Sequence, residues 1–175
     1  MSERLPELTH FSFAPIVDDN SKVLILGTLP GPESLRLGQY YANPNNQFWK
    51  IMHLVFGETL MSPAYDEKVK FLLVRKIALW DVFHSAERVG ALDADIKNAV
   101  PNDIPGLIKQ YPDITRVFLN GKTAEKVYRK HFSAVTIDAL YVPSTSPAYA
   151  KMPLEDKLYA WRDALSHKKT FTNPL

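Results

Sequence analysis

The stretch VLILGTLPGPESLRLGQYYANPNNQFW, residues 23–49, decides the predicted fold. It begins with an apolar run at residues 23–26 that is typical of a buried strand and stops at the turn GTLPG, residues 27–31. A strand that ends in glycine and proline lets backbone N–H groups approach a ligand at the carboxyl edge of an open α/β sheet. The following loop adds aromatic faces and uncharged donors and acceptors, which suit a nucleobase: Tyr40, Tyr41, Asn43, Asn45 and Asn46.

Strands alternate with helices along the rest of the chain. Apolar and β-branched runs predict three more strands, at residues 77–83, 116–119 and 135–142. The spacing of apolar residues predicts helices at residues 46–56, 65–75, 123–131 and 154–165, and a short helix within the proline-containing connection at residues 93–112. This alternation favours an α/β protein, a three-layer α/β/α sandwich with a central, mostly parallel four-stranded sheet. We expect a single domain over residues 1–175, with its core at about residues 20–165 and loose ends such as residues 171–175.

Composition limits the possible classes of protein. A chain of 175 residues that is 46% hydrophobic and 23% charged can bury a core, and its net charge of +2 permits a polyanionic partner without requiring one. It contains no cysteine, which excludes disulfides, thiolate nucleophiles and cysteine metal sites. No apolar run approaches the roughly 20 residues that span a bilayer, and the N-terminal stretch lacks the pattern of a secretory signal. We therefore expect a cytoplasmic protein that does not bind membranes. The histidines and acids show no metal-ligand spacing, so neither a metal nor another cofactor is expected.

The predicted strands end in segments that carry chemistry. In a parallel sheet these carboxyl ends meet at one edge, so residues 27–31, 80–85, 120–122 and 143–147 should converge on one ligand site. The pair Lys122-Thr123 follows a glycine, but the phosphate-loop sequence G-x-x-x-x-G-K-[ST] is absent.

Five short motifs occur in these segments: GTLPG (27–31), QYYANPNNQFW (39–49), LWDV (79–82), LNGK (119–122) and VPSTSPA (142–148). In this order and spacing they resemble the uracil-DNA glycosylase superfamily, most closely its hypoxanthine-DNA (deoxyinosine) glycosylase branch. The resemblance covers about residues 20–165 and implies a uracil-DNA glycosylase-like fold. It also implies a monofunctional, monomeric enzyme of base excision repair, which hydrolyses the N-glycosidic bond of deaminated bases, chiefly hypoxanthine, turned out of double-stranded DNA.

The resemblance moves the expected water-positioning role away from the first motif. The middle position of the first motif, GTLPG, often carries Asp, Glu or Asn in the superfamily, whereas this chain has Leu29. In the hypoxanthine branch an asparagine of the next motif takes this role, and Asn46 matches it best. Asn46 is thus the first catalytic candidate, as a residue that positions water, since an amide takes up no proton at neutral pH. The competing interpretation is a cap for a helix that starts at Gln47, and both roles can coexist.

Asp81 is the second catalytic candidate. Its carboxylate could accept the N1–H of hypoxanthine, which adenine lacks, or act as a general base toward water. The structural alternative is a helix cap or a surface ion pair. His84, three residues later, could hydrogen-bond the leaving purine, although a lone histidine commonly packs or lies on the surface.

The remaining expected contacts follow from the same motifs. Tyr41 matches the stacking position, with core packing as its alternative, and the rest of the expected base pocket consists of Gly27, Thr28, Leu29, Pro30 and Asn43. The hydroxyls and backbone amides of Ser144, Thr145 and Ser146, with Lys151 beyond them, are expected to hold DNA phosphates. Residues 149–152 could fill the gap left by the extruded base, or form an exposed loop.

Two other functions remain open from the sequence. One is a mismatch-specific uracil or thymine glycosylase. However, Val142 stands where superfamily members often carry a histidine that stabilises a departing uracil, which argues against efficient uracil removal. The other is a nucleic-acid-binding module that kept the fold without the chemistry, a possibility raised by Leu29 and Val142 together.

Overall fold

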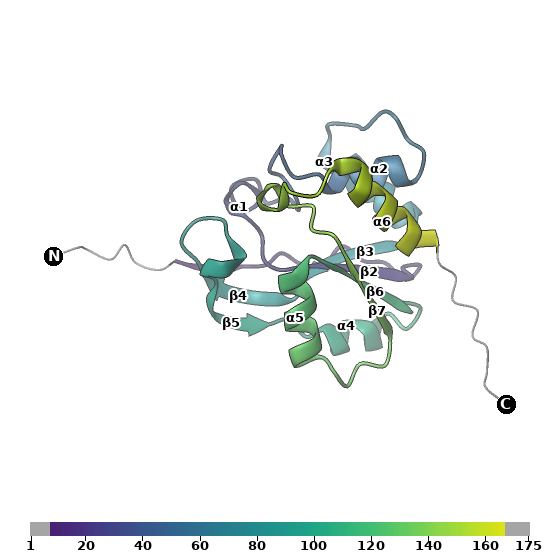
Figure 1. Cartoon of the computed structure of the whole chain (residues 1–175). Helices are drawn as coiled ribbons and strands as arrows, with labels where there is room; N and C mark the ends of the chain where they lie inside the picture. Colours follow the sequence, from purple (N-terminus) through teal and green to yellow (C-terminus); the bar gives the residue numbers. More distant parts are fainter. Residues whose placement is uncertain (1–7, 167–175) are drawn as a thin grey trace.

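A four-stranded parallel sheet lies at the centre of the computed structural model, which describes residues 8–166 (Figure 1). The strand order is β3-β2-β6-β7, and every neighbouring pair is parallel. The strands are β2 (Val23–Gly27), β3 (Ile77–Asp81), β6 (Arg116–Asn120) and β7 (Asp138–Val142). The predicted four-stranded sheet is confirmed, although β7 starts three residues later than the apolar run that predicted it.

Helices cover both faces of this sheet and complete the predicted three layers. Figure 1 shows α2 (Phe48–Val55), α3 (Tyr65–Val74) and α6 (Leu154–Ser166) on one face, with α4 (Ile104–Gln110) and α5 (Lys122–His131) on the other. A further short helix, α1 (Pro32–Leu37), follows the first turn and was not predicted. None of the helices in residues 8–166 is long and apolar enough to cross a membrane.

Alternation along β2 divides the buried core between these two faces. The side chain of Ile25 packs in a cluster with Phe48 and Trp161, whereas Leu24 and Leu26 belong to a cluster on the α4 and α5 side. A strand buried on both faces therefore shows a continuous apolar run instead of an alternating pattern. This is why the run at residues 23–26 marks the centre of the sheet.

The predicted strand at residues 77–83 is confirmed only for residues 77–81. The chain changes sheets at Val82: β3 ends at Asp81, and β4 (Phe83–Glu87) lies in a separate antiparallel sheet with the order β1-β4-β5. Its other strands are β1 (Thr9–Phe11) and β5 (Lys97–Pro101). At the corner, the Val82 N–H donates to the Gly27 carbonyl at 2.9 Å. Both halves of the run are largely buried, so hydrophobicity alone does not reveal the corner.

The expectation of a loose N-terminal end before residue 20 also needs correction for the described residues. β1 pairs with β4, and Ile16 exchanges two backbone hydrogen bonds with Leu79, of 2.9 and 2.8 Å. The expected short helix within residues 93–112 is α4, but the same connection also holds a 3₁₀ turn (Asp93–Asp95) and the strand β5. The expected loose tail at residues 171–175 lies outside the described residues.

The corner between β3 and β4 depends on one buried amide. The Asn102 side chain is 5% exposed, and its Nδ2 donates to the carbonyls of Asp81 (2.8 Å) and Phe83 (3.0 Å). We expect Asn102→Ala to lower the free energy of unfolding by about 2–3 kcal/mol, because two buried carbonyls lose their partner. Chemical denaturation measures this, with the exposed Gln110→Ala on α4 as the control, expected within about 0.5 kcal/mol of wild type. Equal stability of the two variants would contradict this role of Asn102.

Candidate active site

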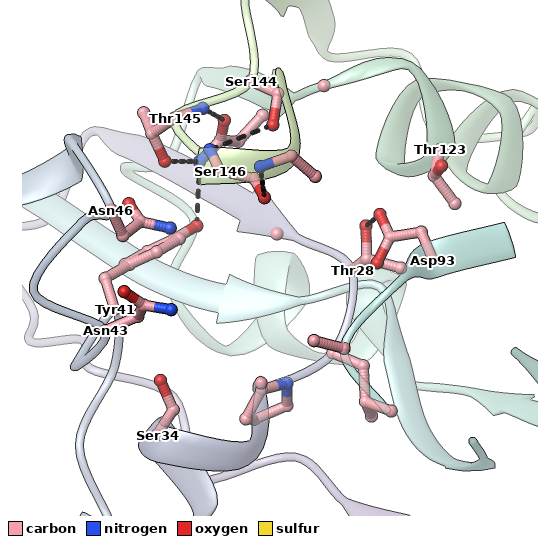
Figure 2. Close-up of a pocket in the computed structure, with 18 of the residues that line it drawn as sticks. Thr28, Ser34, Tyr41, Asn43, Asn46, Asp93, Thr123, Ser144, Thr145 and Ser146 are labelled. Carbon is pink, nitrogen blue, oxygen red and sulfur yellow. Dashed lines mark hydrogen bonds between the residues drawn. The ribbon is translucent and has the colours of Figure 1, made fainter. Parts of the chain in front are cut away.

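One pocket collects the predicted motifs at the carboxyl ends of the parallel strands. It has a volume of about 580 Å³, and its walls come from the first turn, the loop before α2, the connection between β4 and β5, and the loop after β7 (Figure 2). The predicted residues that line it are Gly27, Thr28, Leu29, Pro30, Tyr41, Asn43, Asn46, Asp81, Ser144, Thr145 and Ser146. Segments far apart in the sequence therefore converge as the order of a parallel sheet predicts.

Gly27 provides the space in which two of these residues meet. A Cβ atom on Gly27 would lie 2.7 Å from Asp81 Oδ1 and 2.8 Å from the Tyr41 hydroxyl, closer than real Cβ contacts allow. The register of the sheet brings this about, since Gly27 pairs with Asp81 across β2 and β3. The carboxylate and the phenol thus reach the same corner of the pocket only because this strand ends in glycine.

Asp81 is a buried acid on the pocket floor. Its side chain is 4% exposed, and Oδ2 accepts a hydrogen bond of 2.8 Å from the Ser12 hydroxyl. Burial raises the pKa of Asp81 from 3.8 to about 7, although the Ser12 hydrogen bond favours the ionised form. The surface ion-pair interpretation is therefore wrong for Asp81. A carboxyl group with a pKa near neutrality can both take up and release a proton under ordinary conditions.

Tyr41 presents a flat, rigidly held ring. One face stacks on Phe48, with ring centroids 4.1 Å apart and an interplanar angle of 19°. The hydroxyl accepts a hydrogen bond of 3.0 Å from Asn120 Nδ2, and its pKa is raised by burial and by the nearby Asp81, so the phenol stays protonated at neutral pH. Phe48 covers one face of the Tyr41 ring, and Tyr41 also lines the pocket. The ring can therefore pack against the core on one face and stack against a base on the other.

Asn120 is a site residue that the motif reading did not single out. Its amide also donates to Thr145 Oγ1 (3.1 Å), and its Oδ1 accepts from the Thr145 N–H (3.1 Å). Both ends of the Asn120 amide are thus engaged within the protein, and they join Tyr41 to the loop after β7. Its signal in the sequence was its place in the motif LNGK, directly after a predicted strand.

Asn46 holds the start of α2 and also lines the pocket. Its Oδ1 accepts a hydrogen bond of 3.0 Å from the Phe48 N–H at the start of the helix, but α2 begins one residue later than expected, so Gln47 is the N-cap and Asn46 lies just before it. A carbonyl oxygen has two lone pairs, so one acceptor site of Oδ1 remains available. Figure 2 shows the amides of Asn43 and Asn46 on the same side of the pocket as Tyr41, with their nitrogens toward the pocket.

The loop that carries Asn46 is fixed at several points. Asn43 Oδ1 accepts from the Asn45 N–H at 2.9 Å, and the Gln47 N–H donates to the Thr145 carbonyl at 3.0 Å. The buried Lys157 on α6 donates to Gln47 Oε1 (3.0 Å) and to the Tyr149 carbonyl (2.8 Å). The two loops on this side of the pocket are therefore tied together by backbone and side-chain hydrogen bonds.

The hydroxyls of Ser144 and Ser146, in the motif VPSTSPA, accept hydrogen bonds from backbone N–H groups of the same turn. Ser144 Oγ accepts from the Ser146 N–H, and Ser146 Oγ accepts from the Ala148 N–H, both at 3.2 Å. Thr145 is 1% exposed, and its hydroxyl accepts a hydrogen bond from the Asn120 amide. Ser144 and Ser146 are half-buried and also line the pocket.

Two predicted residues lie outside the pocket. His84 is exposed on β4, with its ring edge-on to Phe11 at 5.8 Å, because the chain turns at Val82 and alternation along β4 points this side chain away. The expected contact between His84 and the base is thus not supported by the geometry. Lys151 is exposed, with its ammonium group 5.5 Å from the ring centre of Tyr149, a residue that does line the pocket.

The connection between β4 and β5 adds two charged groups that sequence reasoning missed. The side chain of Arg88 is 3% exposed and donates to the carbonyls of Pro30 and Gly90. Asp93 Oδ2 accepts a hydrogen bond of 3.0 Å from the Thr28 hydroxyl. No motif marks this connection, so nothing in the sequence placed it over the pocket. Within residues 8–166, no three histidine or acidic side chains gather as metal ligands.

The raised pKa of Asp81 makes stability depend on pH. The folded state holds a proton on Asp81 between about pH 3.8 and 7 that the unfolded chain has lost, so the free energy of unfolding falls as pH rises through this window. Asp81→Asn stays neutral, so we expect it to match wild type near pH 4 and to exceed its stability near pH 8, by up to about 4 kcal/mol. Urea unfolding at the two pH values tests this, with Asp95→Asn, an exposed carboxylate, as the control. Parallel pH profiles for wild type and Asp81→Asn would contradict the burial argument.

Comparison with known proteins identifies the family. Residues 14–165 match the family model described as the uracil DNA glycosylase superfamily. A hypoxanthine DNA glycosylase of Methanosarcina acetivorans is 38% identical over 136 residues, which cover 78% of this chain and 85% of that protein. Another from Methanosarcina barkeri is 35% identical over 152 residues, or 87% and 95% of the two chains. The NMR structure of a uracil DNA glycosylase-like protein from Methanosarcina acetivorans superposes with a TM-score of 0.80 at 33% identity, covering 91% of this chain and all of the other. The chain belongs to the uracil DNA glycosylase superfamily.

Proposed function

We propose that this protein is a DNA glycosylase that releases hypoxanthine from deoxyinosine in double-stranded DNA. The observation that carries the proposal is the convergence of the Tyr41 ring, the Asn46 amide and the buried Asp81 acid on one pocket. These are a stacking wall, a group that can hold water and a group that can accept a proton. The two Methanosarcina relatives named hypoxanthine DNA glycosylase support the choice of base.

The reaction breaks the bond between C1′ and N9 of the purine nucleotide. As the base leaves with the bonding electrons, the sugar becomes oxocarbenium-like; water adds to C1′ and gives up a proton, and the base gains one. The extruded purine stacks against the Tyr41 ring, and the backbone of residues 27–31 borders it closely because the turn carries no bulky side chain at Gly27.

Asn46 and Asp81 divide the handling of water between them. The Asn46 Nδ2, which faces the pocket, donates a hydrogen bond to the water's oxygen and so holds this oxygen near C1′, while one of its lone pairs stays free to attack. Asp81, with a pKa of about 7, takes up the proton that this water releases. Leu29 cannot do either, which is why the first turn shapes the pocket without supplying the chemistry.

A purine is favoured over uracil by the last motif. Val142 is 1% exposed and offers no hydrogen-bond donor toward a departing pyrimidine anion. The Ser144 and Ser146 region and Lys151 then hold the phosphates beside the extruded nucleotide.

We further propose that the enzyme acts in the cytoplasm as a monomer, which light scattering would show as a particle of 19.9 kDa.

The assignment of Asn46 is tested by excision from labelled duplexes that contain a single inosine, uracil or xanthine, followed by alkaline cleavage of the abasic sites. We expect wild type to cut at inosine and Asn46→Ala to lose at least about 100-fold in rate, because the water is no longer held. Uracil-specific breaks would instead indicate a uracil glycosylase, and retardation on a gel without breaks would indicate a binding module.

Two control variants separate catalysis from capping. Asn45→Ala changes an exposed neighbour that does not line the pocket and should retain activity. Asn46→Ser keeps a hydroxyl that can accept from the Phe48 N–H, so it should fold like wild type but remain inactive, because it lacks the amide N–H that faces the pocket. Full activity of Asn46→Ser would limit Asn46 to its structural role.

The role of Asp81 is tested by the pH dependence of the single-turnover rate. A general base must be ionised, so the wild-type rate should rise with pH and level off above about pH 7. Asp81→Asn should be slower, by about 100-fold or more, and should lose this rise. If Asp81→Asn impaired hypoxanthine release but spared any residual activity on uracil, Asp81 would be a reader of N1–H instead of a base for water.

A further inference from the structure

The connection between β4 and β5 forms the wall of the pocket opposite the asparagines. Arg88, Leu92 and Asp93 of this connection line the pocket, although it has no part in any of the five motifs. In Figure 2, Asp93 and Thr28 lie on one side of the pocket, and Tyr41, Asn43 and Asn46 lie on the other. A base that stacks against Tyr41 therefore has the Asp93 side of the pocket across from the water-handling groups.

Asp93 is held in place while part of its carboxylate stays open. Oδ2 accepts the hydrogen bond of 3.0 Å from the Thr28 hydroxyl, and Thr28 itself is 8% exposed, so the donor is anchored in the first turn. Asp93 as a whole remains solvent-exposed at the pocket. Burial of the carboxyl group raises its pKa, while the Thr28 hydrogen bond, the nearby Arg88 guanidinium and the Thr123 hydroxyl favour the ionised form. The Thr28 hydrogen bond positions the carboxylate, and all three groups favour its acceptor form.

An acid here is unfavourable for binding DNA in general, because a carboxylate accepts hydrogen bonds only and repels phosphates. It suits a donor on the base itself. Enzymes that extrude a nucleotide read it through hydrogen bonds to its Watson–Crick edge. Hypoxanthine presents N1–H as a donor on that edge, whereas adenine, the base from which it arises by deamination, presents N1 as an acceptor.

We propose that the Asp93 carboxylate accepts the N1–H of the extruded hypoxanthine and thereby rejects adenine. The inference rests on the proposed glycosylase function and assigns its base selectivity to a residue outside the five motifs. It also leaves Asp81, on the floor beside Gly27 and Ser12, free to serve the water.

The test measures binding separately from cleavage. The probes are duplexes with a single 2′-fluoro-2′-deoxyinosine or 2′-fluoro-2′-deoxyadenosine, because the fluorine disfavours the oxocarbenium-like state and keeps the bond intact. Each stands opposite an abasic site, so that extrusion breaks no base pair in either duplex. A third duplex carries a tetrahydrofuran residue in place of the nucleotide and reports contacts to the backbone alone.

We expect wild type to prefer the inosine duplex and Asp93→Ala to reduce this preference by about 10- to 100-fold, the loss of one hydrogen bond to a charged group. Affinity for the tetrahydrofuran duplex should not change. Asp95→Ala, an acid in the same 3₁₀ turn that does not line the pocket, should behave as wild type. Asp93→Asn should raise affinity for the adenosine duplex in particular, because an amide N–H can donate to N1 of adenine, and a merely structural role would not produce this gain.

Three results would overturn the inference. An unchanged preference in Asp93→Ala would show that another group reads the base. An equal loss of affinity for all three duplexes would place Asp93 in the support of the backbone contacts. If wild type showed neither a preference for inosine nor release of hypoxanthine from the ordinary substrate, the proposed function would fail and the inference with it.

Discussion

The absent side chain of Gly27 is the constraint on which the site depends. Parallel pairing of β2 and β3 places Asp81 beside Gly27, and the loop before α2 brings the Tyr41 hydroxyl to the same point. A single methyl group there would lie within 3 Å of both oxygens. The position must therefore be glycine for the acid and the aromatic ring to share one corner. The close approach is fixed by the sheet register, which the buried core on both faces of β2 holds in place.

Two acids at the pocket are partly removed from water, which makes their ionised forms less stable in the folded protein. Asp81 and Asp93 are both desolvated, and each pKa is raised as a result. The positive charge of Arg88 favours the ionised form of both acids, while its own hydrogen bonds go to the carbonyls of Pro30 and Gly90. The guanidinium thus fixes the first turn to the β4–β5 connection. Burial of Asp81 at this pocket strengthens each interaction that its carboxyl group makes with a substrate.

Much of the site followed from local patterns, because the carboxyl ends of neighbouring parallel strands must meet at one edge. Gly27, Asp81 and the 144–146 turn reach the pocket for this reason. The hydrogen bond of Asn46 to the helix start agrees with the preference of asparagine for such positions, although Gln47 is the N-cap. His84 was misplaced, because hydrophobicity did not reveal the corner at Val82 or the second sheet beyond it. Asp93 and Arg88 were missed because they reach the pocket from a connection without a motif, and Ser12 was missed because it contacts Asp81 from the segment after β1, which also carries no motif.

The sequence by itself determined the class of fold, the family and the edge of the sheet at which the site lies. These depend on short-range features: apolar runs, turn residues and their order along the chain. Only the tertiary structure decided which oxygen atoms meet and how far their acidity shifts. The proximity of Ser12 to Asp81, of Thr28 to Asp93 and of Asn120 to Tyr41 joins residues 65 to 79 positions apart. Such contacts, and the desolvation that accompanies them, depend on how the layers pack, and no local pattern in the chain encodes them.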